Sequence, residues 1–325
     1  MTEPKPYFLF TRTPLHVGAG QSVGYVDLPI QREPHTRIPI VPGSSFKGVL
    51  ADLWNEVAKD DTGKESIRRS RDGEWLFGKG AGESDGGAAG ALLLSEARVL
   101  CFPVRSAKGS FAWLTCPLAL ARYARDAKPT DDKGQALATK FNGLTETPQN
   151  NRITVLAGSE VTLTRTENNQ PVNEVVLEEY TYAARTDTVL SAWESHLKNL
   201  PGLVADPVWQ LLPGRLVIVP DGIFSFYVQS ACEIAQHVKI DDDTGTAADK
   251  ALFNQENCPS ETLFHGVVAA QRIKPPGEDK ARDAAEALKK LGDLNAKALQ
   301  IGGDETTGLG WCSFLFAHDG GQPQS

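Results

Sequence analysis

Cysteine is scarce in this sequence, and its arrangement excludes the sites that cysteines usually build. The five cysteines of the 325-residue chain stand singly and form no C-x-x-C pair. Zinc sites commonly use such pairs, and disulfides are typical of secreted proteins rather than cytoplasmic ones. We therefore expect five reduced thiols in a cytoplasmic protein, with no disulfide and no zinc site.

Export and membrane signals are missing as well. The first ten residues, MTEPKPYFLF, contain no basic segment that leads into a long apolar run, so no signal peptide is predicted. No stretch approaches the length of a membrane span. The apolar fraction of 41% and the charged fraction of 23% are ordinary for a soluble globular protein. We therefore expect no membrane association.

Familiar enzyme motifs and an excess of basic charge are also lacking. The sequence has neither the GxSxG elbow of serine hydrolases nor the GxxxxGK[ST] loop of P-loop proteins. An enzyme that uses a nucleotide is therefore disfavoured. The net charge of −8 argues against a general nucleic-acid coat, because phosphate binding needs clustered Lys and Arg. A local basic groove on an acidic body is still compatible with this charge.

The most informative stretch covers residues 16–48. It contains a glycine turn, one carboxylate between apolar residues and a short basic run. The carboxylate belongs to Asp27, and Arg32, His35 and Arg37 follow it closely. Two interpretations are open: Asp27 forms a structural ion pair with one of these basic residues, or it is held toward a substrate.

A helix start closes the same stretch. Ser44 and Ser45 are good N-cap residues, and apolar residues recur at helical spacing from Phe46 to Val57. Lys47 then lies in the first turn of an amphipathic helix. An anion at this end would meet free backbone N–H groups, a favourable helix dipole and a lysine.

A glycine-rich loop at residues 302–310 lies between an expected long helix at 278–300 and a strand at 311–316. Successive backbone N–H groups in such a loop can bind a phosphate, and the hydroxyls of Thr306 and Thr307 can add hydrogen bonds. The alternative is a helix C-cap followed by a tight turn.

Strand–helix–strand order near the start, and strand–helix–glycine loop–strand order at the end, predict a ferredoxin-like α+β core with large insertions. Residues 161–166 and 172–177 flank a polar turn, which predicts a projecting β-hairpin. The Gly- and Ala-rich residues 78–90 are expected to form a flexible surface loop, and the tail 318–325 is expected to be disordered. The aspartates at 241–243 lack the later ligands of a calcium loop, which favours a solvated turn.

Six segments in order resemble the RAMP superfamily of CRISPR proteins, specifically the repeated backbone subunit of the type III-B (Cmr) effector complex. They are TPLHVGAG, VDLPIQRE, IPIVPGSSFKG, LLLSEARVLCFPVRSAKGSFAWLTCPLAL, NQENCPSETLF and GGDETTGLG. The resemblance covers nearly the whole length and implies a single RAMP domain over 1–325. It also implies a ferredoxin-like (RRM-like) palm and a projecting hairpin thumb, which we place at 160–180.

The resemblance implies copies of the chain stacked in a helical filament along a guide RNA, next to other subunits of the complex. Each thumb would distort the duplex between guide and single-stranded target RNA. The chain would then act as an endoribonuclease that cuts the target at regular intervals with Mg²⁺ or another divalent cation. The matching catalytic residue and metal ligand is Asp27, with His16 and Glu256 as further catalytic candidates. A non-catalytic guide-binding subunit is the alternative.

The resemblance also assigns RNA-backbone contacts to the SSFKG segment and to the glycine-rich loop. The residues concerned are Ser44, Ser45, Lys47, Gly302, Gly303, Thr306, Thr307 and Gly308. Arg32 and Arg37 are candidates to bind RNA or, alternatively, to hold Asp27 in place. Leu309 stands where a basic residue is expected in many relatives, so a phosphate contact is expected to be missing there.

Overall fold

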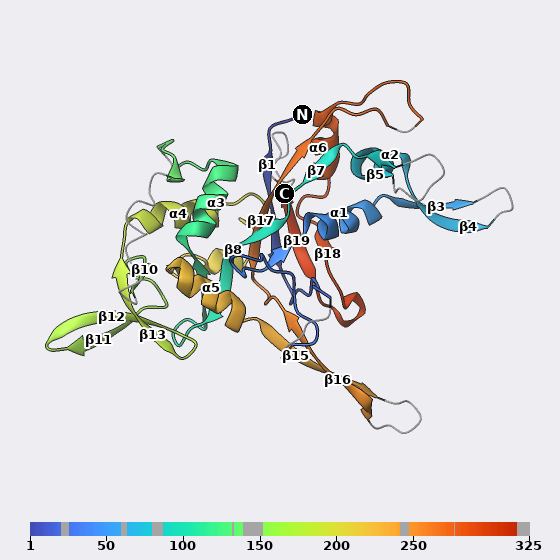
Figure 1. Ribbon diagram of the computed structural model, residues 1–325. Coiled ribbons are helices and arrows are strands. Elements are labelled where there is room, and N and C mark those ends of the chain that lie inside the picture. The colour runs from blue at the N-terminus through green and yellow to red at the C-terminus, as the bar shows by residue number, and fades with distance from the viewer. Residues whose placement is uncertain are drawn as a thin grey trace.

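One large mixed sheet organises the molecule (Figure 1). The computed structural model describes residues 1–20, 26–59, 64–79, 87–131, 133–138, 152–240, 247–275 and 277–316. The sheet order is β11-β12-β13-β10-β14-β9-β8-β17-β1-β19-β18, with β2 added to β8 and β7 added to β17. Its pairs are antiparallel except for the parallel pairs β10–β13 and β9–β14. The predicted α+β class is therefore confirmed in this coarse form.

The thirteen strands of this sheet are β1 (Lys5–Thr11), β2 (Ile40–Val41), β7 (Leu92–Leu94), β8 (Ala97–Arg105), β9 (Phe111–Thr115), β10 (Arg152–Val155), β11 (Leu163–Glu167), β12 (Gln170–Leu177), β13 (Tyr180–Thr186), β14 (Leu216–Ile218), β17 (Leu263–Ala270), β18 (Ala298–Gln300) and β19 (Trp311–Phe316). Three two-stranded ribbons are separate from it: β3 (Asn55–Lys59) with β4 (Glu65–Arg69), β5 (Gly78–Lys79) with β6 (Ala88–Ala89), and β15 (Glu233–Ile240) with β16 (Ala247–Asn257). The helices are α1 (Gly43–Asp52), α2 (Arg71–Phe77), α3 (Pro117–Ala127), α4 (Val189–Lys198), α5 (Asp221–Ser230) and α6 (Ala284–Gly292), with 3₁₀ turns η2 (Trp209–Leu211) and η3 (Glu305–Thr307).

Both faces of the sheet are buried around β1, as the sequence of this strand illustrates. Successive side chains of a strand point to opposite faces. Tyr7 and Leu9 join a core cluster that also contains buried residues of α1, α2, α5 and α6. Phe8 and Phe10 join a second cluster with residues of α3 and α4. Each such side chain contributes about 1.5–3 kcal/mol when fully buried. The near-continuous apolar run of β1 is therefore the signature of a strand covered on both sides.

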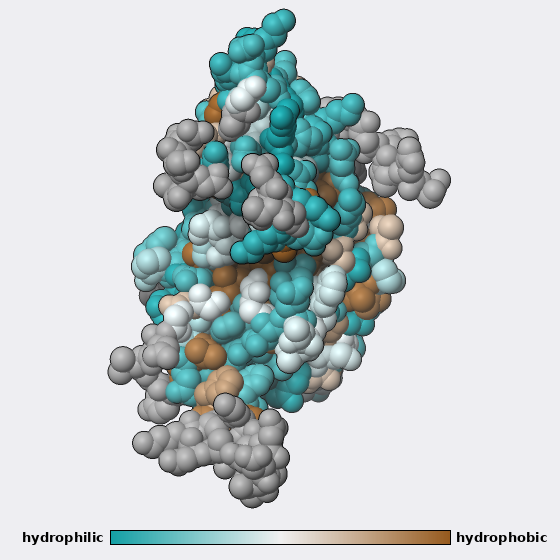
Figure 2. Space-filling view, turned by 90° about the vertical axis from the view of Figure 1, so that its right-hand side faces the viewer, coloured by the Kyte–Doolittle hydropathy of each residue, from teal (hydrophilic) through white to brown (hydrophobic). Residues whose placement is uncertain are grey.

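Two ribbons project from this body (Figure 1). The β3–β4 ribbon and the β15–β16 ribbon leave it in different directions, and the β11–β12 hairpin ends the sheet at a third place. Figure 2, seen from the β3–β4 side, shows mostly hydrophilic residues with separate hydrophobic spots between them. Among the described residues, no helix is both long and apolar enough to cross a membrane.

Helix boundaries differ from the sequence prediction at α1. The helix begins at Gly43 behind Pro42, and no side chain caps it. Ser44 and Ser45 therefore lie in the first turn and are not N-caps. The helix ends at Asp52, and Val57 lies on β3, where it is 66% exposed. The helical spacing up to Val57 was misleading because this segment pairs with β4 to form a ribbon.

The prediction of one long helix at 278–300 is also wrong. Asp283 caps a nine-residue α6 by accepting the N–H of Ala285, and the helix ends at Gly292. Ala296 then adopts a left-handed conformation with φ of 61°, and the chain continues as β18. The apolar spacing therefore belongs to a shorter helix than predicted.

The predicted hairpin between 161 and 177 is confirmed as β11–β12, with Asn168 and Asn169 in a two-residue turn at φ of 50° and 60°. The Gly- and Ala-rich segment 78–90 is only partly a loop, because its ends pair as β5 and β6. Its residues 80–86, the aspartates at 241–243 and the tail 318–325 lie outside the described residues. All five cysteines are free thiols, as expected.

Candidate functional site

The end of β16 supports the loop that carries Asp27. The backbone N–H of Asp27 donates to the carbonyl of Asn254 at 3.1 Å, and Oδ2 of Asp27 accepts the N–H of Asn254 at 2.8 Å. The next residue, Leu28, forms a parallel bridge with Gln255. Asp27 itself is exposed. Its carboxylate is therefore held in place by a neighbouring backbone and still faces solvent, where a substrate can approach it.

The proposed ion pair between Asp27 and the basic run is wrong. Nη2 of Arg32 lies 2.5 Å from Oε1 of Glu256, and the Arg32 side chain is only 6% exposed. Nη1 of Arg32 donates to the carbonyl of Arg37 at 2.8 Å. Within the part of the chain that the structure describes, neither Arg32, His35 nor Arg37 pairs with Asp27. Arg32 thus faces the interior, whereas Arg37 is exposed.

Glu256 is the buried partner that captures Arg32. The residue is 7% exposed, and its second oxygen, Oε2, accepts the backbone N–H of Ile30 at 3.1 Å. Both carboxylate oxygens of Glu256 therefore bind groups of the loop that follows Asp27: the N–H of Ile30 and the guanidinium of Arg32. A buried carboxylate is stable as an anion when it is paired and hydrogen-bonded in this way. Its geometry is that of an anchor for the Asp27 loop.

His16 lies on the other side of the same strand end. Its Nδ1 is 2.7 Å from the carbonyl oxygen of Glu256, and the residue is 8% exposed. A carbonyl oxygen only accepts hydrogen bonds, so Nδ1 carries the hydrogen and Nε2 is the nitrogen left for proton exchange. His16 and Asp27 are thus both held by residues at the end of β16.

The glycine-rich loop packs directly on His16. The N–H of Gly303 donates to the carbonyl of His16 at 2.9 Å. Gly302 has φ of 86°, and a Cβ there would lie 2.1 Å from that carbonyl oxygen, so only glycine fits. The loop follows β18 and precedes β19, which makes the helix C-cap interpretation wrong.

The loop offers polar groups to solvent. Gly302, Gly303, Thr306 and Thr307 are exposed, and Gly308 adopts φ of 86° in partial exposure. The hydroxyl of Thr307 donates to the carbonyl of Asp304 at 2.9 Å, which leaves its oxygen able to accept a further hydrogen bond. This exposed surface could contact an RNA backbone.

The start of α1 is anchored to the core by one aromatic side chain. Phe46 is fully buried and stacks on Tyr7 with ring centroids 5.0 Å apart. Ser44 is exposed, and Ser45 and Lys47 are partly exposed. The helix therefore presents these three residues on the surface beside its N-terminus.

A second buried carboxylate, Glu33, fixes the far end of the Asp27 loop. Oε1 of Glu33 is 3.2 Å from Nε of Arg98 on β8, and Oε2 is 2.9 Å from Nη1 of Arg122 on α3. Burial alone would raise the pKa of Glu33, but the hydrogen bonds of Thr36 and Arg122 and the charges of Arg122 and Arg98 outweigh it. The pKa of Glu33 is lowered as a result. The loop is thus tied to the body by two ion-paired glutamates, Glu33 and Glu256.

No metal cage is present among the described residues, where no group of three or more His, Cys, Asp and Glu side chains converges. Asp27 uses Oδ2 for the N–H of Asn254, and within the described ranges no hydrogen bond is made to its Oδ1. Mg²⁺ is commonly held by one or two carboxylates together with substrate phosphates. Asp27 fits a shared site of this kind, as its single protein ligand.

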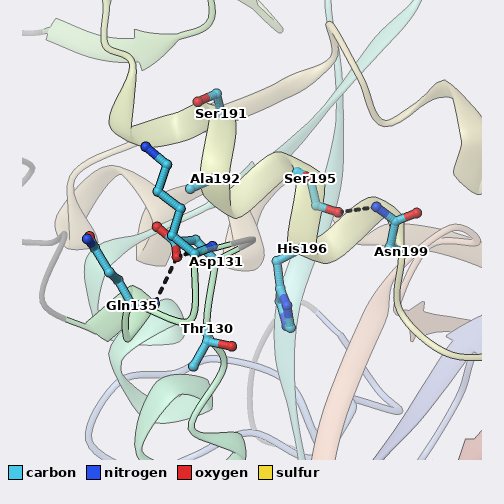
Figure 3. A pocket seen from close by; sticks show the side chains of 9 residues that line it. Thr130, Asp131, Gln135, Ser191, Ala192, Ser195, His196 and Asn199 are labelled. Carbon is cyan, nitrogen blue, oxygen red and sulfur yellow. Dashed lines mark hydrogen bonds between the residues drawn. The ribbon is translucent and has the colours of Figure 1, made fainter.

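A cavity of about 420 Å³ lies between α4 and a group of residues that includes Thr130, Asp131 and Gln135 (Figure 3). It is lined by His196, whose Nε2 lies 2.9 Å from the hydroxyl of Tyr123. Burial lowers the pKa of His196, which favours the neutral imidazole. None of the predicted site residues lines this cavity. It therefore belongs to a different part of the molecule.

The sequence analysis missed the β15–β16 ribbon, whose base carries Asn254, Gln255 and Glu256. The signal was present, because apolar residues alternate along 234–240 before a polar Asp-, Thr- and Gly-containing segment. Val238 and Leu252 face each other across the ribbon and are 49% and 60% exposed.

Comparisons with known proteins agree with these features. The sequence model of the RAMP superfamily matches residues 9–313. The CRISPR system Cmr endoribonuclease Cmr4 of Pyrococcus furiosus is 35% identical over 303 residues, which are 93% of this chain and 92% of that protein. The crystal structure of oligomeric Cmr4 from Pyrococcus furiosus is similar with a TM-score of 0.62 and 27% identity, covering 98% of this chain and 99% of the other.

A cryo-EM structure of type III-B Cmr-beta bound to cognate target RNA also contains a similar chain. The TM-score is 0.65 at 17% identity, and the likeness covers 97% of each chain. At that identity the likeness concerns the fold alone. Together with the matched family model and the Cmr4 relative, it leads to one conclusion: this chain belongs to the RAMP superfamily.

Proposed function

We propose that this chain is a repeated backbone subunit of a type III-B CRISPR ribonucleoprotein, which binds guide RNA and cuts complementary target RNA at regular intervals. The observation that carries the proposal is the placement of Asp27, an exposed carboxylate fixed on the end of β16. The 35% identity to a Cmr endoribonuclease over most of both chains supports the reaction class. The partners are the guide, the target, further copies of the chain and other Cmr subunits.

The guide strand runs over the palm, the ferredoxin-like part of the sheet around β1, β17 and β19. Its phosphates contact the start of α1, where Lys47 supplies charge and Ser44 and Ser45 supply hydroxyls. The glycine-rich loop adds the exposed groups of Thr306 and Thr307. Arg37 is exposed and can reach RNA, whereas Arg32 is buried against Glu256 and acts on the loop instead. The chain works in the cytoplasm, where its free thiols stay reduced.

Cleavage begins with attack of a target ribose 2′-OH on the adjacent phosphate, once the strand is held in line for it. Positioning of this kind can supply a large share of the rate. Asp27 orients the hydroxyl or accepts its proton, because a carboxylate within hydrogen-bond reach can act as a general base. A divalent cation held by Asp27 and the RNA would stabilise negative charge at the phosphate. The leaving 5′ oxygen needs a proton as its bond to phosphorus breaks, and His16 in its doubly protonated form would donate that proton from Nε2.

The thumb in this proposal is a β-hairpin that distorts the target next to the cleaved bond. The sequence indicates residues 160–180, the β11–β12 hairpin, for this role, and that assignment stays a prediction. The β15–β16 ribbon is a second candidate, favoured by a specific contact: Asn254 of this ribbon binds Asp27 directly. Apolar side chains that enter a base stack can unstack it, and Val238 and Leu252 are exposed apolar residues on this ribbon.

The variant Asp27→Asn tests the proposal. Assembled on guide RNA, it should bind complementary RNA as the unchanged protein does, and the regular cuts should be lost, with at least about a hundredfold slower cleavage for the loss of a proton acceptor. Binding is followed by gel shift, and cleavage is followed on end-labelled target with Mg²⁺ added. Regular cuts at the unchanged rate would show that Asp27 is structural and that the catalytic site is wrongly assigned.

A further inference from the structure

The side chain of Gln255 connects the two halves of the candidate site. Its Nε2 donates to Oδ2 of Asp304 at 2.7 Å and to Oδ1 of Asn257 at 3.1 Å. An amide nitrogen has two hydrogens, so both of its donors are used. The bond to Asp304 ends on a carboxylate, and charge-assisted hydrogen bonds are shorter and stronger than neutral ones. Gln255 is 2% exposed, so water competes little for this contact.

The backbone of Gln255 faces the Asp27 loop. Gln255 forms the parallel bridge with Leu28, the residue after Asp27. Its neighbour Asn254 binds Asp27, and the carbonyl of its other neighbour, Glu256, binds His16. Any shift of Gln255 along the strand therefore moves the support of the loop that carries Asp27.

Asp304 in turn organises the glycine-rich loop. Its carbonyl oxygen accepts the N–H of Thr307 at 3.1 Å, the hydroxyl of Thr307 at 2.9 Å and the N–H of Leu309 at 3.2 Å. Asp304 holds φ of 60°, a left-handed conformation that few side chains favour. The side chain of Asp304 accepts the hydrogen bond from Gln255, and this bond holds Asp304 in place. The exposed threonines of the loop are held in place with it.

We propose that Gln255 and Asp304 form a latch that couples RNA contact at the glycine-rich loop to the position of Asp27. Gln255 is a positioning residue in this arrangement, because it touches no reacting atom and acts through β16. RNA bound to the loop holds Asp304, Asp304 holds Gln255, and Gln255 keeps the Asp27 loop in register. The inference rests on the proposed function, since it assigns a role within the same site.

The main test moves the carboxylate from one side of the latch to the other by substitutions at Gln255 and Asp304. Gln255→Glu places two carboxylates against each other, so cleavage should slow by about tenfold to a hundredfold, the cost of a small misplacement of reacting groups. Affinity for the target should change by less than about threefold, because base pairing with the guide is intact. Adding Asp304→Asn returns a donor opposite the new carboxylate, and Asn tolerates the left-handed conformation. The double variant should therefore recover most of the lost rate.

A second set of variants avoids the buried position. Asp304→Gly removes the latch at an exposed site where φ of 60° suits glycine. Glu305→Gly removes the neighbouring exposed carboxylate, which makes no hydrogen bond through its side chain among the described residues. Both changes remove one negative charge from the loop, so any gain in RNA affinity is common to both. Only Asp304→Gly should slow cleavage.

The outcomes separate the latch from the proposed function. Cleavage is measured on assembled guide–protein complexes with end-labelled target, and folding is checked by thermal unfolding of each variant. If the unchanged protein does not cut, the proposed function fails. If it cuts, and Asp304→Gly cuts as fast as Glu305→Gly, the latch is wrong. A double variant no faster than Gln255→Glu would also overturn it.

Discussion

Asp27 and Glu256 carry the same functional group in opposite surroundings. Asp27 is exposed and bound through one oxygen to a backbone N–H, whereas Glu256 is buried and bound through both oxygens. A charge in the interior is stable only with its partner present. We therefore expect substitution of Asp27 to change the cleavage rate, and substitution of Glu256 to change the free energy of unfolding.

Glu256→Gln should lower the free energy of unfolding by about 3 kcal/mol, because it leaves the buried guanidinium of Arg32 without its anion. Asp27→Asn should change that free energy by less than about 0.5 kcal/mol, as is usual for an exposed position. Urea unfolding followed by circular dichroism measures both. A Glu256→Gln protein as stable as the unchanged one would mean that the carbonyls of Arg37 and Val228 satisfy Arg32 by themselves.

At the scale of elements, two hairpins are candidates to contact the target RNA in the proposed complex. The β15–β16 ribbon touches Asp27 through Asn254, and the β11–β12 hairpin continues the sheet through β13. Val238 and Leu252 of the ribbon and Leu163 of the hairpin are exposed apolar side chains. Their positions differ, and among the described residues only the β15–β16 ribbon shares backbone contacts with the loop that carries Asp27.

Replacing Val238 and Leu252 together by Ser should slow target cleavage by about tenfold, equivalent to about 1.4 kcal/mol in the barrier. The reason is that the apolar pair no longer enters the base stack beside Asp27. Guide affinity should stay unchanged in a filter-binding assay. The matched control is Leu163→Ser, which removes an apolar side chain that is 38% exposed on β11. Slower or irregular cutting by the control alone would assign the thumb to β11–β12.

Glu33 makes the anchoring of the Asp27 loop dependent on pH. Its pKa is lowered in the folded protein, and an unfolded glutamate titrates near 4.3. The stabilisation is therefore complete above about pH 4.3 and is lost as pH falls through the lower folded pKa. Glu33→Gln should show a shallower fall in the free energy of unfolding below that pH. Urea unfolding at a series of acidic pH values measures it, and parallel slopes for both proteins would contradict this account.

For the whole molecule, net charge sets the sign of the salt effect on assembly. Each copy carries −8, so copies without RNA repel one another, and raising salt should strengthen their association. With guide RNA bound, the contacts are with phosphates, and raising salt from about 50 to about 200 mM should weaken the assembly. Light scattering with and without guide RNA measures both trends. The same sign in both series would mean that the guide does not hold the copies together.

The sequence predicted the parts of the fold that local patterns determine. The strand β19 and the Asn168–Asn169 hairpin follow from apolar residues and turn residues in the sequence. Asp27 and the glycine-rich loop were singled out from the residues themselves, and the family resemblance then assigned their roles. The helix lengths were not predictable, because the ends of α1 and α6 depend on the β3–β4 ribbon and on a cap at Asp283.

Partners distant in sequence were beyond the reach of local reasoning. Arg32 is 224 residues from Glu256 in the sequence. From the sequence alone, each of them could equally well have paired with an opposite charge closer to it. The three basic residues next to Asp27 looked like its ion-pair partners because sequence distance was the only measure available. The fold instead brought the end of β16 to the loop, and a backbone N–H took the place of a basic side chain.

The support of Asp27 by β16 has a consequence for protein synthesis. β1 pairs only with β17 and β19 in the sheet, so the first strand made waits for strands that begin at residues 263 and 311. His16 and Asp27 likewise meet Glu256 and Asn254 only after most of the chain has left the ribosome. A nascent chain, or a product truncated before residue 254, carries Asp27 without its support. Asp27 therefore reaches its supported position only in a chain that has been synthesised at least as far as residue 254.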